Sequence, residues 1–464
     1  MSYLEFIRLA YGLLLFLTLI MTLPHARRFF ASERYGGYAK SAGFSDAVQS
    51  PAGITLIFIV WLAAAVALII GFQTIIFALI NLALCYYFFV RTRWKSILRG
   101  MGAPGFMTYW LAALIFFLEY AQKFDPGHKL LEQTLLVFKI DFALIMLAAG
   151  FYKLIAGYAK NYGVEFGSAN PWWGYWWRFY KKLNPHHWAF RVLNFFAFNT
   201  EILAGVLMLV PLAQFFGGLL IAATFLFILT QIRLGFLGEM VILATFLFTG
   251  ETIFGNAEAA KIVDVSSPLL GLPNGILSVF LWAYLIMQPL AYGFMYYNFL
   301  GRKRLPKIIQ AVMEKYTNFF GMIIWRVFTV DIVNFFANIY LQDRTTGARK
   351  KYSNWLRFWH VGESITLASL FTTLKYYPSN FDLFKERILR YAKTIPGAKE
   401  SLVIFEYMSI QKDNQFRFAP AAEFIIDAER GTVEERTIIK NFSVRAVHAV
   451  SPVFEAAKPG SYAP

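Results

Sequence analysis

Ionisable side chains inside strongly apolar segments are the residues of this chain best suited to chemistry. They are Asp141, Lys153, Glu201, Arg233 and Glu239. A charged group at membrane depth is costly, so such residues usually pair with one another or serve a function. Two interpretations follow. One is a polar cavity between helices, in which Glu201 pairs with a lysine or an arginine. The other is a set of structural ion pairs that fix the register of the helices.

A lysine followed by a dense aromatic segment is the second feature. Lys160 ends an apolar run, and residues 172–180 hold four tryptophans and two tyrosines, beginning with Trp172 and Trp173. Such a segment is typical of a membrane interface, or of the wall of a site for a flat apolar ligand such as a quinone. Lys160 is a candidate base if burial favours its neutral form, and otherwise a snorkelling anchor at a helix end.

Residue types that bind metals are sparse. His186 and His187 are adjacent and point in different directions on a helix, whereas His360 and Glu363 share a helix face. One such pair without companions predicts no metal site. The single cysteine, Cys85, lies in an apolar run, which excludes a disulfide framework.

These residues belong to a chain with the composition of an integral membrane protein. Of its 464 residues, 58% are hydrophobic and 16% are charged, whereas soluble domains carry about 25% charged residues. A helix needs about 20 apolar residues to cross a bilayer. The stretches that meet or approach this length are 5–23, 53–71, 74–90, 105–121, 135–157, 189–210, 212–232, 234–250 and 275–299. The sequence predicts an all-α polytopic bundle of about nine transmembrane helices within residues 1–300.

Loop charges predict how the bundle lies in the membrane. Lysines and arginines crowd the connections after the first, third, fifth and ninth stretches, which share one side if nine helices is the right count. The positive-inside rule places this side in the cytoplasm and the amino terminus outside. We expect a multi-pass protein of the plasma (inner) membrane. Its net charge of +16 then reflects anchoring loops and lipid contact rather than nucleic-acid binding.

The tail after residue 300 has a different pattern. Residues 301–378 are apolar but interrupted by polar positions, and we expect amphipathic, interfacial helices at 317–341 and 353–377. Residues 379–464 are expected to form a small α+β extramembrane module. Within it, the predicted strands are 401–410, 422–426 and 432–439, the last two joined by a turn at 427–431.

Several short segments resemble the horizontally transferred transmembrane domain (HTTM) family, which is related to vitamin K-dependent gamma-carboxylase. The similar segments are Tyr152 to Lys160 (YKLIAGYAK), Trp172-Trp173, Thr200 to Gly205 (TEILAG), Gln231 to Glu239 and, more weakly, Arg93-Trp94-Lys95. The resemblance covers about residues 1–300.

The resemblance implies a quinol-dependent modification enzyme with carboxylase-like chemistry. Lys160 then stands where the family's base deprotonates a hydroquinone, and an apolar pocket suits that step. Trp172, Trp173, Tyr152, Glu201 and Arg233 are the corresponding ligand-binding candidates. A quinone or hydroquinone is the implied cofactor and a peptide is a possible substrate.

A second function class stays open on the same residues. The chain fits a non-enzymatic accessory or assembly subunit of a membrane complex, whose aromatic helices bind lipid, quinone or pigment. A transporter is disfavoured, because the sequence has no repeated halves and no pair of broken helices.

Overall fold

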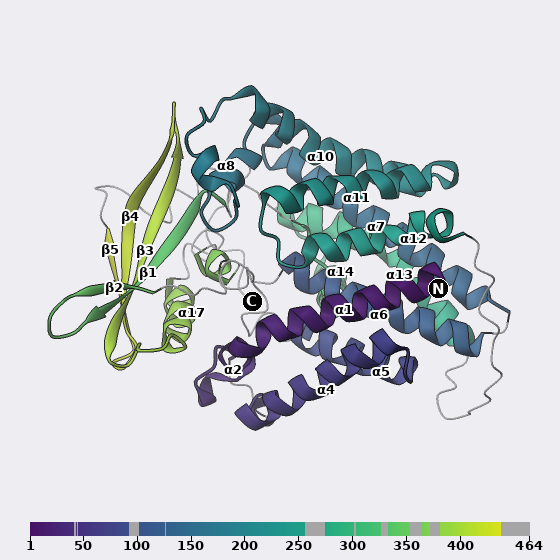
Figure 1. Ribbon diagram of the computed structural model, residues 1–464, viewed down its shortest axis with the longest axis horizontal. Helices are drawn as coiled ribbons and strands as arrows, with labels where there is room; N and C mark the ends of the chain where they lie inside the picture. The colour runs from purple at the N-terminus through teal and green to yellow at the C-terminus, as the bar shows by residue number, and fades with distance from the viewer. Residues whose placement is uncertain are drawn as a thin grey trace.

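The protein consists of a helical bundle with a β-sheet module beside one end of it, as a computed structural model shows (Figure 1). The structure describes residues 1–40, 43, 45–91, 102–125, 127–255, 274–300, 303–325, 333–352, 364, 366–371 and 381–437. The N-terminus lies at the end of the bundle away from the sheet (Figure 1). The bundle and the module therefore occupy opposite halves of the molecule.

Eight helices in the described ranges are long and apolar enough to cross a membrane. The long bundle helices are α1 (Tyr3–Thr22), α4 (Pro51–Ile70), α6 (Gly102–Phe124), α7 (Lys129–Ile155), α10 (Trp188–Leu209), α11 (Gln214–Gln231), α12 (Leu237–Phe254) and α13 (Asn274–Met295). They confirm the predicted polytopic bundle. The third predicted stretch, 74–90, is a shorter apolar element, Thr74–Val90, made of α5 (Thr74–Cys85) and a π-helical end (Tyr86–Arg91).

Small residues let α7 and α10 lie close together. A Cβ added to Gly150 of α7 would lie 2.7 Å from the Ile202 side chain, and one added to Gly205 of α10 would lie 2.6 Å from Leu147. Close backbone approach through small residues is how membrane helices gain packing contact without a hydrophobic driving force. The two helices that carry Lys153 and Glu201 are thereby fixed side by side.

A buried polar network holds the first half of the bundle together. The Trp61 indole donates to Asn81 Oδ1 at 2.9 Å, and Asn81 Nδ2 donates to the Tyr11 hydroxyl at 2.8 Å. That hydroxyl donates in turn to the Thr108 carbonyl at 3.1 Å. The network joins α1, α4, α5 and α6 through three side chains and the Thr108 carbonyl, and none of these three side chains has a buried polar atom without a partner.

The module is one antiparallel sheet of five strands in the order β2-β1-β3-β4-β5. The strands are β1 (Phe335–Asp343), β2 (Arg349–Lys351), β3 (Ser401–Lys412), β4 (Phe416–Asp427) and β5 (Thr432–Thr437). Helix α17 (Phe381–Lys393) packs on one face through Phe384, whose ring lies 5.0 Å from that of Phe424. The predicted α+β module and its three strands are confirmed over the described residues.

The predicted amphipathic helix at 317–341 is wrong. Helix α14 (Lys307–Phe319) ends near the start of that range, and β1 occupies its end, from Phe335 onward. Asn338 donates to Glu406 on the neighbouring strand, while Phe335, Ala337 and Ile339 are buried. A polar spacing of four residues, as between Asn334 and Asn338, fits one helical face and also two strand periods, so it did not separate the alternatives. The module therefore begins before residue 379.

The structure bears on two further parts of the tail, the predicted helix at 353–377 and the segment before residue 320. Most of the predicted helix at 353–377 lies outside the described residues. Helix α14 is amphipathic, with Met313 and Thr317 buried and Ile308 and Val312 exposed.

Two basic loops of the bundle meet the module, as their shared side predicts. From the first loop, Arg28 Nε donates to Thr394 Oγ1 at 2.7 Å and Lys40 pairs with Glu386 of α17 at 2.9 Å. The segment after α7 contacts the sheet as well, through α8 (Val164–Ala169) (Figure 1).

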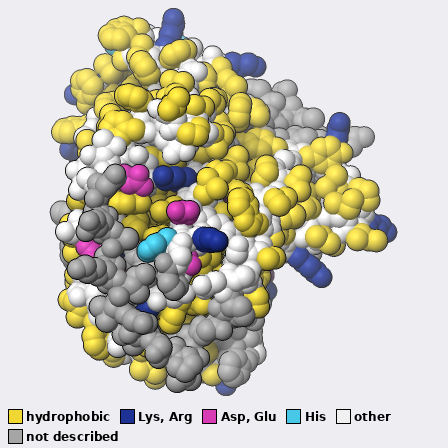
Figure 2. Space-filling view, turned by 90° about the vertical axis from the view of Figure 1, so that its right-hand side faces the viewer, with side chains coloured by type: hydrophobic (Ala, Val, Ile, Leu, Met, Phe, Trp, Pro, Cys, Tyr) yellow, Lys and Arg dark blue, Asp and Glu magenta, His cyan; other side chains and the backbone are white. Residues whose placement is uncertain are grey.

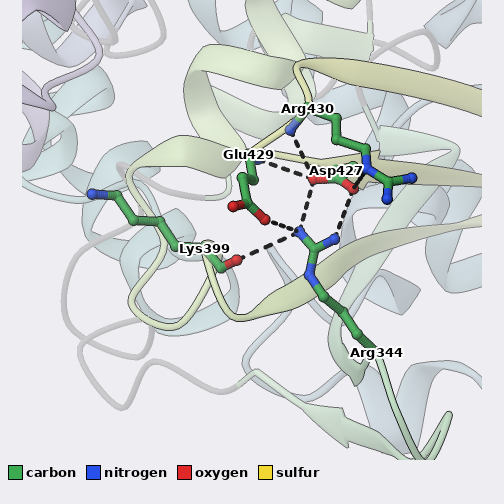
Figure 3. A network of polar contacts seen from close by, with 5 residues as sticks. All are labelled: Arg344, Lys399, Asp427, Glu429 and Arg430. Atoms are coloured by element: carbon green, nitrogen blue, oxygen red, sulfur yellow. Dashed lines mark hydrogen bonds and ion pairs between the residues drawn. The ribbon is translucent and has the colours of Figure 1, made fainter.

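An arginine–carboxylate network closes one edge of the module (Figure 3). Arg344, in the β1–β2 turn, donates to both carboxylate oxygens of Asp427 at 2.8 and 2.7 Å, and its Nη2 also contacts Glu429 and the Lys399 carbonyl. Asp427 Oδ1 additionally accepts from the backbone N–H groups of Glu429 and Arg430. The bond from Arg344 and these backbone bonds hold the pKa of Asp427 well below its ordinary value.

We expect the module to lose stability below about pH 4. The pKa of Asp343 falls to about 2, because the backbone N–H of Thr346 and the hydroxyls of Thr345 and Thr346 bond its carboxylate. A carboxyl with a lowered folded pKa contributes stability above its unfolded pKa, near 3.8, and loses it as pH falls through the folded value. Thermal unfolding of the module between pH 5 and about 2 measures the loss. Asp427→Asn should flatten the dependence, and an equally steep profile in that variant would contradict the assignment.

Candidate functional site

An ion pair buried between α7 and α10 is the centre of the candidate site. Lys153 Nζ donates to Glu201 Oε1, and the two side chains are only 6% and 2% exposed. The other carboxylate oxygen of Glu201, Oε2, is buried and accepts no hydrogen bond from any described residue. Glu201 therefore has a lysine partner, as one sequence interpretation expected, and keeps an oxygen ready to accept from a ligand.

Tyrosines flank this ion pair. Tyr152, adjacent to Lys153 on α7, is buried. The Tyr296 hydroxyl donates to the carbonyl of Ala148, which lies one helical turn before Tyr152 on α7. Tyr296 begins a π-helical turn (Tyr296–Leu300) at the end of α13 and lies within electrostatic range of Glu201. Such π-helical turns are frequent at functional sites. The pair is thus surrounded by α7, α10 and the end of α13.

A second buried carboxyl lies deeper in the bundle. Asp141 of α7 accepts from the Trp110 indole at 2.8 Å and from the Tyr284 hydroxyl at 2.7 Å, both on Oδ2. Lys139, its neighbour in sequence, lies within electrostatic range of Glu251 instead. Both Asp141 partners are neutral donors, whereas Glu201 has a cationic one.

Lys160 is exposed in the structure. It ends a short 3-10 turn (Tyr158–Lys160) after α7, outside the apolar core of the bundle. A lysine base needs burial to favour its neutral form, and this position does not supply it. The lysine of the same sequence segment that is buried is Lys153.

The first two tryptophans of the aromatic segment after Lys160 pack against the sheet module. Trp172 and Trp173 are buried, and the Trp172 ring lies 6.0 Å from that of Phe335 in β1. Arg233 follows α11 and donates to the Pro171 carbonyl, while its backbone N–H donates to the Trp173 carbonyl. The structure therefore brings Trp172, Trp173 and Arg233 together at the sheet junction. Glu201 lies inside the bundle with Lys153, the neighbour of Tyr152 on α7.

Lys412 forms the polar part of that junction and has no counterpart among the sequence candidates. From the β3–β4 hairpin it donates to Glu165 Oε1 and to the Asn161 carbonyl, both at 2.6 Å. Glu165 also accepts from Asn194 of α10 at 2.8 Å, and Tyr162 places its ring 4.4 Å from the Lys412 ammonium. Because Lys412 and Glu165 are distant in sequence, no local sequence pattern predicts that they pair.

The opposite end of the bundle also gathers charge. Figure 2 looks at this end and shows acidic, basic and histidine side chains grouped in a hollow among apolar ones. Arg8 of α1 pairs with Glu119 of α6 at 3.3 Å, and the Tyr3 hydroxyl contacts Glu251 at 3.3 Å. These contacts tie α1 to α6 and α12 at the end of the bundle that carries the N-terminus.

Replacing Lys412 with Met should loosen the module from the bundle. The change leaves the Glu165 carboxylate buried without a cation, which costs about 3–5 kcal/mol. The measurement is thermal unfolding of the purified protein, together with the rate of proteolysis at the 157–163 loop. Lys182→Met, at an exposed lysine of the same loop region, is the control, with an expected effect within about 0.5 kcal/mol. Equal behaviour of the two variants would contradict a stabilising junction.

Comparisons with protein-family models, with curated proteins and with solved structures found no match to this chain. Within the ranges that the structure describes, no group of three or more histidine, cysteine, aspartate or glutamate side chains could hold a metal ion.

Proposed function

We propose that the protein is a membrane enzyme of the HTTM type that removes a proton from a hydroxyl group of an apolar, hydroquinone-like substrate. The observation that carries this proposal is the free, buried Oε2 of Glu201 beside the Lys153 ammonium. A hydroxyl donor is the natural complement of a carboxylate oxygen that lacks one. The membrane is the medium in which such an apolar substrate dissolves.

The proposed step is a single proton transfer. The substrate O–H bond breaks, the proton binds Glu201 Oε2, and the negative charge moves to the substrate oxygen. The Lys153 ammonium then pairs with that oxyanion in place of the carboxylate, so the charge on the site is unchanged. Because the pair is buried between apolar helices, this electrostatic stabilisation is stronger than it would be in solution.

Two segments that resemble the HTTM family support this assignment. Lys153 belongs to the Tyr152 to Lys160 segment, and Glu201 to the Thr200 to Gly205 segment. The resemblance pointed to Lys160 as the base. We assign the chemistry to Lys153 and Glu201 instead, because they are buried and paired while Lys160 is exposed.

Glu201→Gln should abolish deprotonation of a bound hydroquinone. The probe is 1,4-naphthohydroquinone under argon, with the full-length protein in lipid nanodiscs. The absorbance of the naphthoquinolate anion reports the proton transfer, and equilibrium dialysis measures binding separately. Because glutamine keeps the shape but cannot take the proton, we expect binding to persist while the anion signal falls to the level of empty nanodiscs.

Lys160→Ala distinguishes the two candidate bases. The exposed position of Lys160 predicts an anion signal equal to that of the unchanged protein. Loss of the signal in Lys160→Ala with its retention in Glu201→Gln would overturn our assignment and restore Lys160 as the base.

A non-catalytic subunit of a membrane complex is the second candidate function. The observation that favours it is a group of exposed aromatic side chains near the sheet junction, which includes Trp176, Phe179 and Trp188. Aromatic residues are enriched at protein interfaces. Gentle purification from native membranes should then yield stoichiometric partner subunits, which the triple change of these residues to Ser would release. A lone monomer from such membranes would count against this function.

A further inference from the structure

One face of α13 carries a row of polar side chains at regular helical spacing. Tyr284, Gln288, Tyr292 and Tyr296 follow one another at intervals of four residues. Side chains four residues apart lie on the same helix face, about 6 Å apart along the axis. Gln288 and Tyr292 are buried, so this row, which we call the α13 polar row, faces the bundle rather than lipid.

Asp141 stands at one end of the α13 polar row. The Tyr284 hydroxyl donates to its carboxyl at 2.7 Å, as does the Trp110 indole at 2.8 Å. The side chain is 1% exposed, and no lysine, arginine or histidine in the described ranges forms an ion pair with it. Burial without a cation favours the neutral acid, whereas the two donors favour the carboxylate. A neutral acid protonated on Oδ1 keeps both of these bonds, because its Oδ2 still accepts them.

The groups around Asp141 are phenols and an indole from three helices. Besides Tyr284 and Tyr292 of α13, they are Tyr109 and Trp110 of α6 and Tyr316 of α14. Lys139 lies on α7 itself but within electrostatic range of Glu251. None of these neighbours supplies a compensating positive charge to the carboxyl.

The other end of the α13 polar row reaches the proposed catalytic pair. Tyr296 donates to the Ala148 carbonyl and lies within electrostatic range of Glu201. Tyr292, between the ends, lies within electrostatic range of both Asp141 and Tyr296. The row therefore runs along α7 from one buried carboxyl to the other.

The backbone of α13 is irregular beside the row. Pro289 lies inside the helix and cannot donate to the Leu285 carbonyl, which leaves that oxygen as an additional acceptor next to Gln288. Tyr316 adds a further hydroxyl, which donates to the Tyr284 carbonyl at 3.3 Å and accepts from Gln288 at 3.5 Å. Polar groups at this depth are the partners that bound water needs.

We propose that Asp141 is a protonated acid at neutral pH and that the α13 polar row is a proton path between it and the Lys153–Glu201 pair. In this path each tyrosine hydroxyl and each bridging water accepts a proton on one side while it releases its own on the other, so none changes its net composition. The Gln288 amide relays no proton and holds the water between Tyr284 and Tyr292 in place. The use of this path in turnover rests on the proposed function; the path itself does not.

Infrared difference spectroscopy of the full-length protein in nanodiscs tests the first part. The carbonyl stretching band of a protonated carboxylic acid should be present at pH 7, absent in Asp141→Asn and retained in Glu201→Gln, because Glu201 is paired with a cation. A spectrum with no such band, or a band that persists in Asp141→Asn, would overturn the protonated acid.

Deuterium exchange of the same band tests the path. After transfer to heavy water, the Asp141 carboxyl should exchange its proton about tenfold more slowly in Gln288→Leu and in Tyr292→Phe than in the unchanged protein. This change corresponds to a barrier increase of about 1.4 kcal/mol. Tyr297→Phe, an exposed tyrosine of the same helix outside the row, is the matched control and should exchange at the normal rate. Unchanged rates in both row variants would overturn the path. Neither readout uses the hydroquinone reaction, so failure of the proposed function leaves this test intact.

Discussion

Two ionisable residues of α7, Asp141 and Lys153, need partners from other helices of the bundle. Asp141 and Lys153 project from one membrane helix, and each needs partners that only other helices can provide. Trp110 of α6 and Tyr284 of α13 supply them for Asp141, and Glu201 of α10 supplies one for Lys153. Helix α7 therefore determines which helices surround it.

The sheet module is attached to the same arrangement at one end of the bundle. Lys412 reaches Glu165, and Glu165 is held by Asn194, which lies two helical turns before Glu201 on α10. Trp172 packs on β1, so the aromatic segment joins bundle to module. The module thus contacts the helix that carries the candidate catalytic carboxylate, and a disturbance of the junction reaches α10 directly.

Hydropathy and alternation predicted the apolar helices and the strands at 401–439, because both patterns depend on local periodicity. They failed at β1, where Asn334 and Asn338 fit a helix and a strand equally well. Sequence spacing did not show which lysine of the site candidates is buried, and the structure does. Lys153 and Lys160 lie in one segment, yet only Lys153 is enclosed by a facing helix, and Lys412 meets Glu165 across a long stretch of chain. Such contacts exist only after folding.

In the proposed function, Glu201 Oε2 is kept free for a substrate hydroxyl. Electron cryomicroscopy of the protein in nanodiscs, with and without 1,4-naphthohydroquinone under argon, tests it most directly. Our account predicts ring-shaped density with one oxygen within hydrogen-bond distance, about 2.5–3.0 Å, of Glu201 Oε2. A protein donor on Oε2 in both maps, or ligand density only at another place, would contradict it.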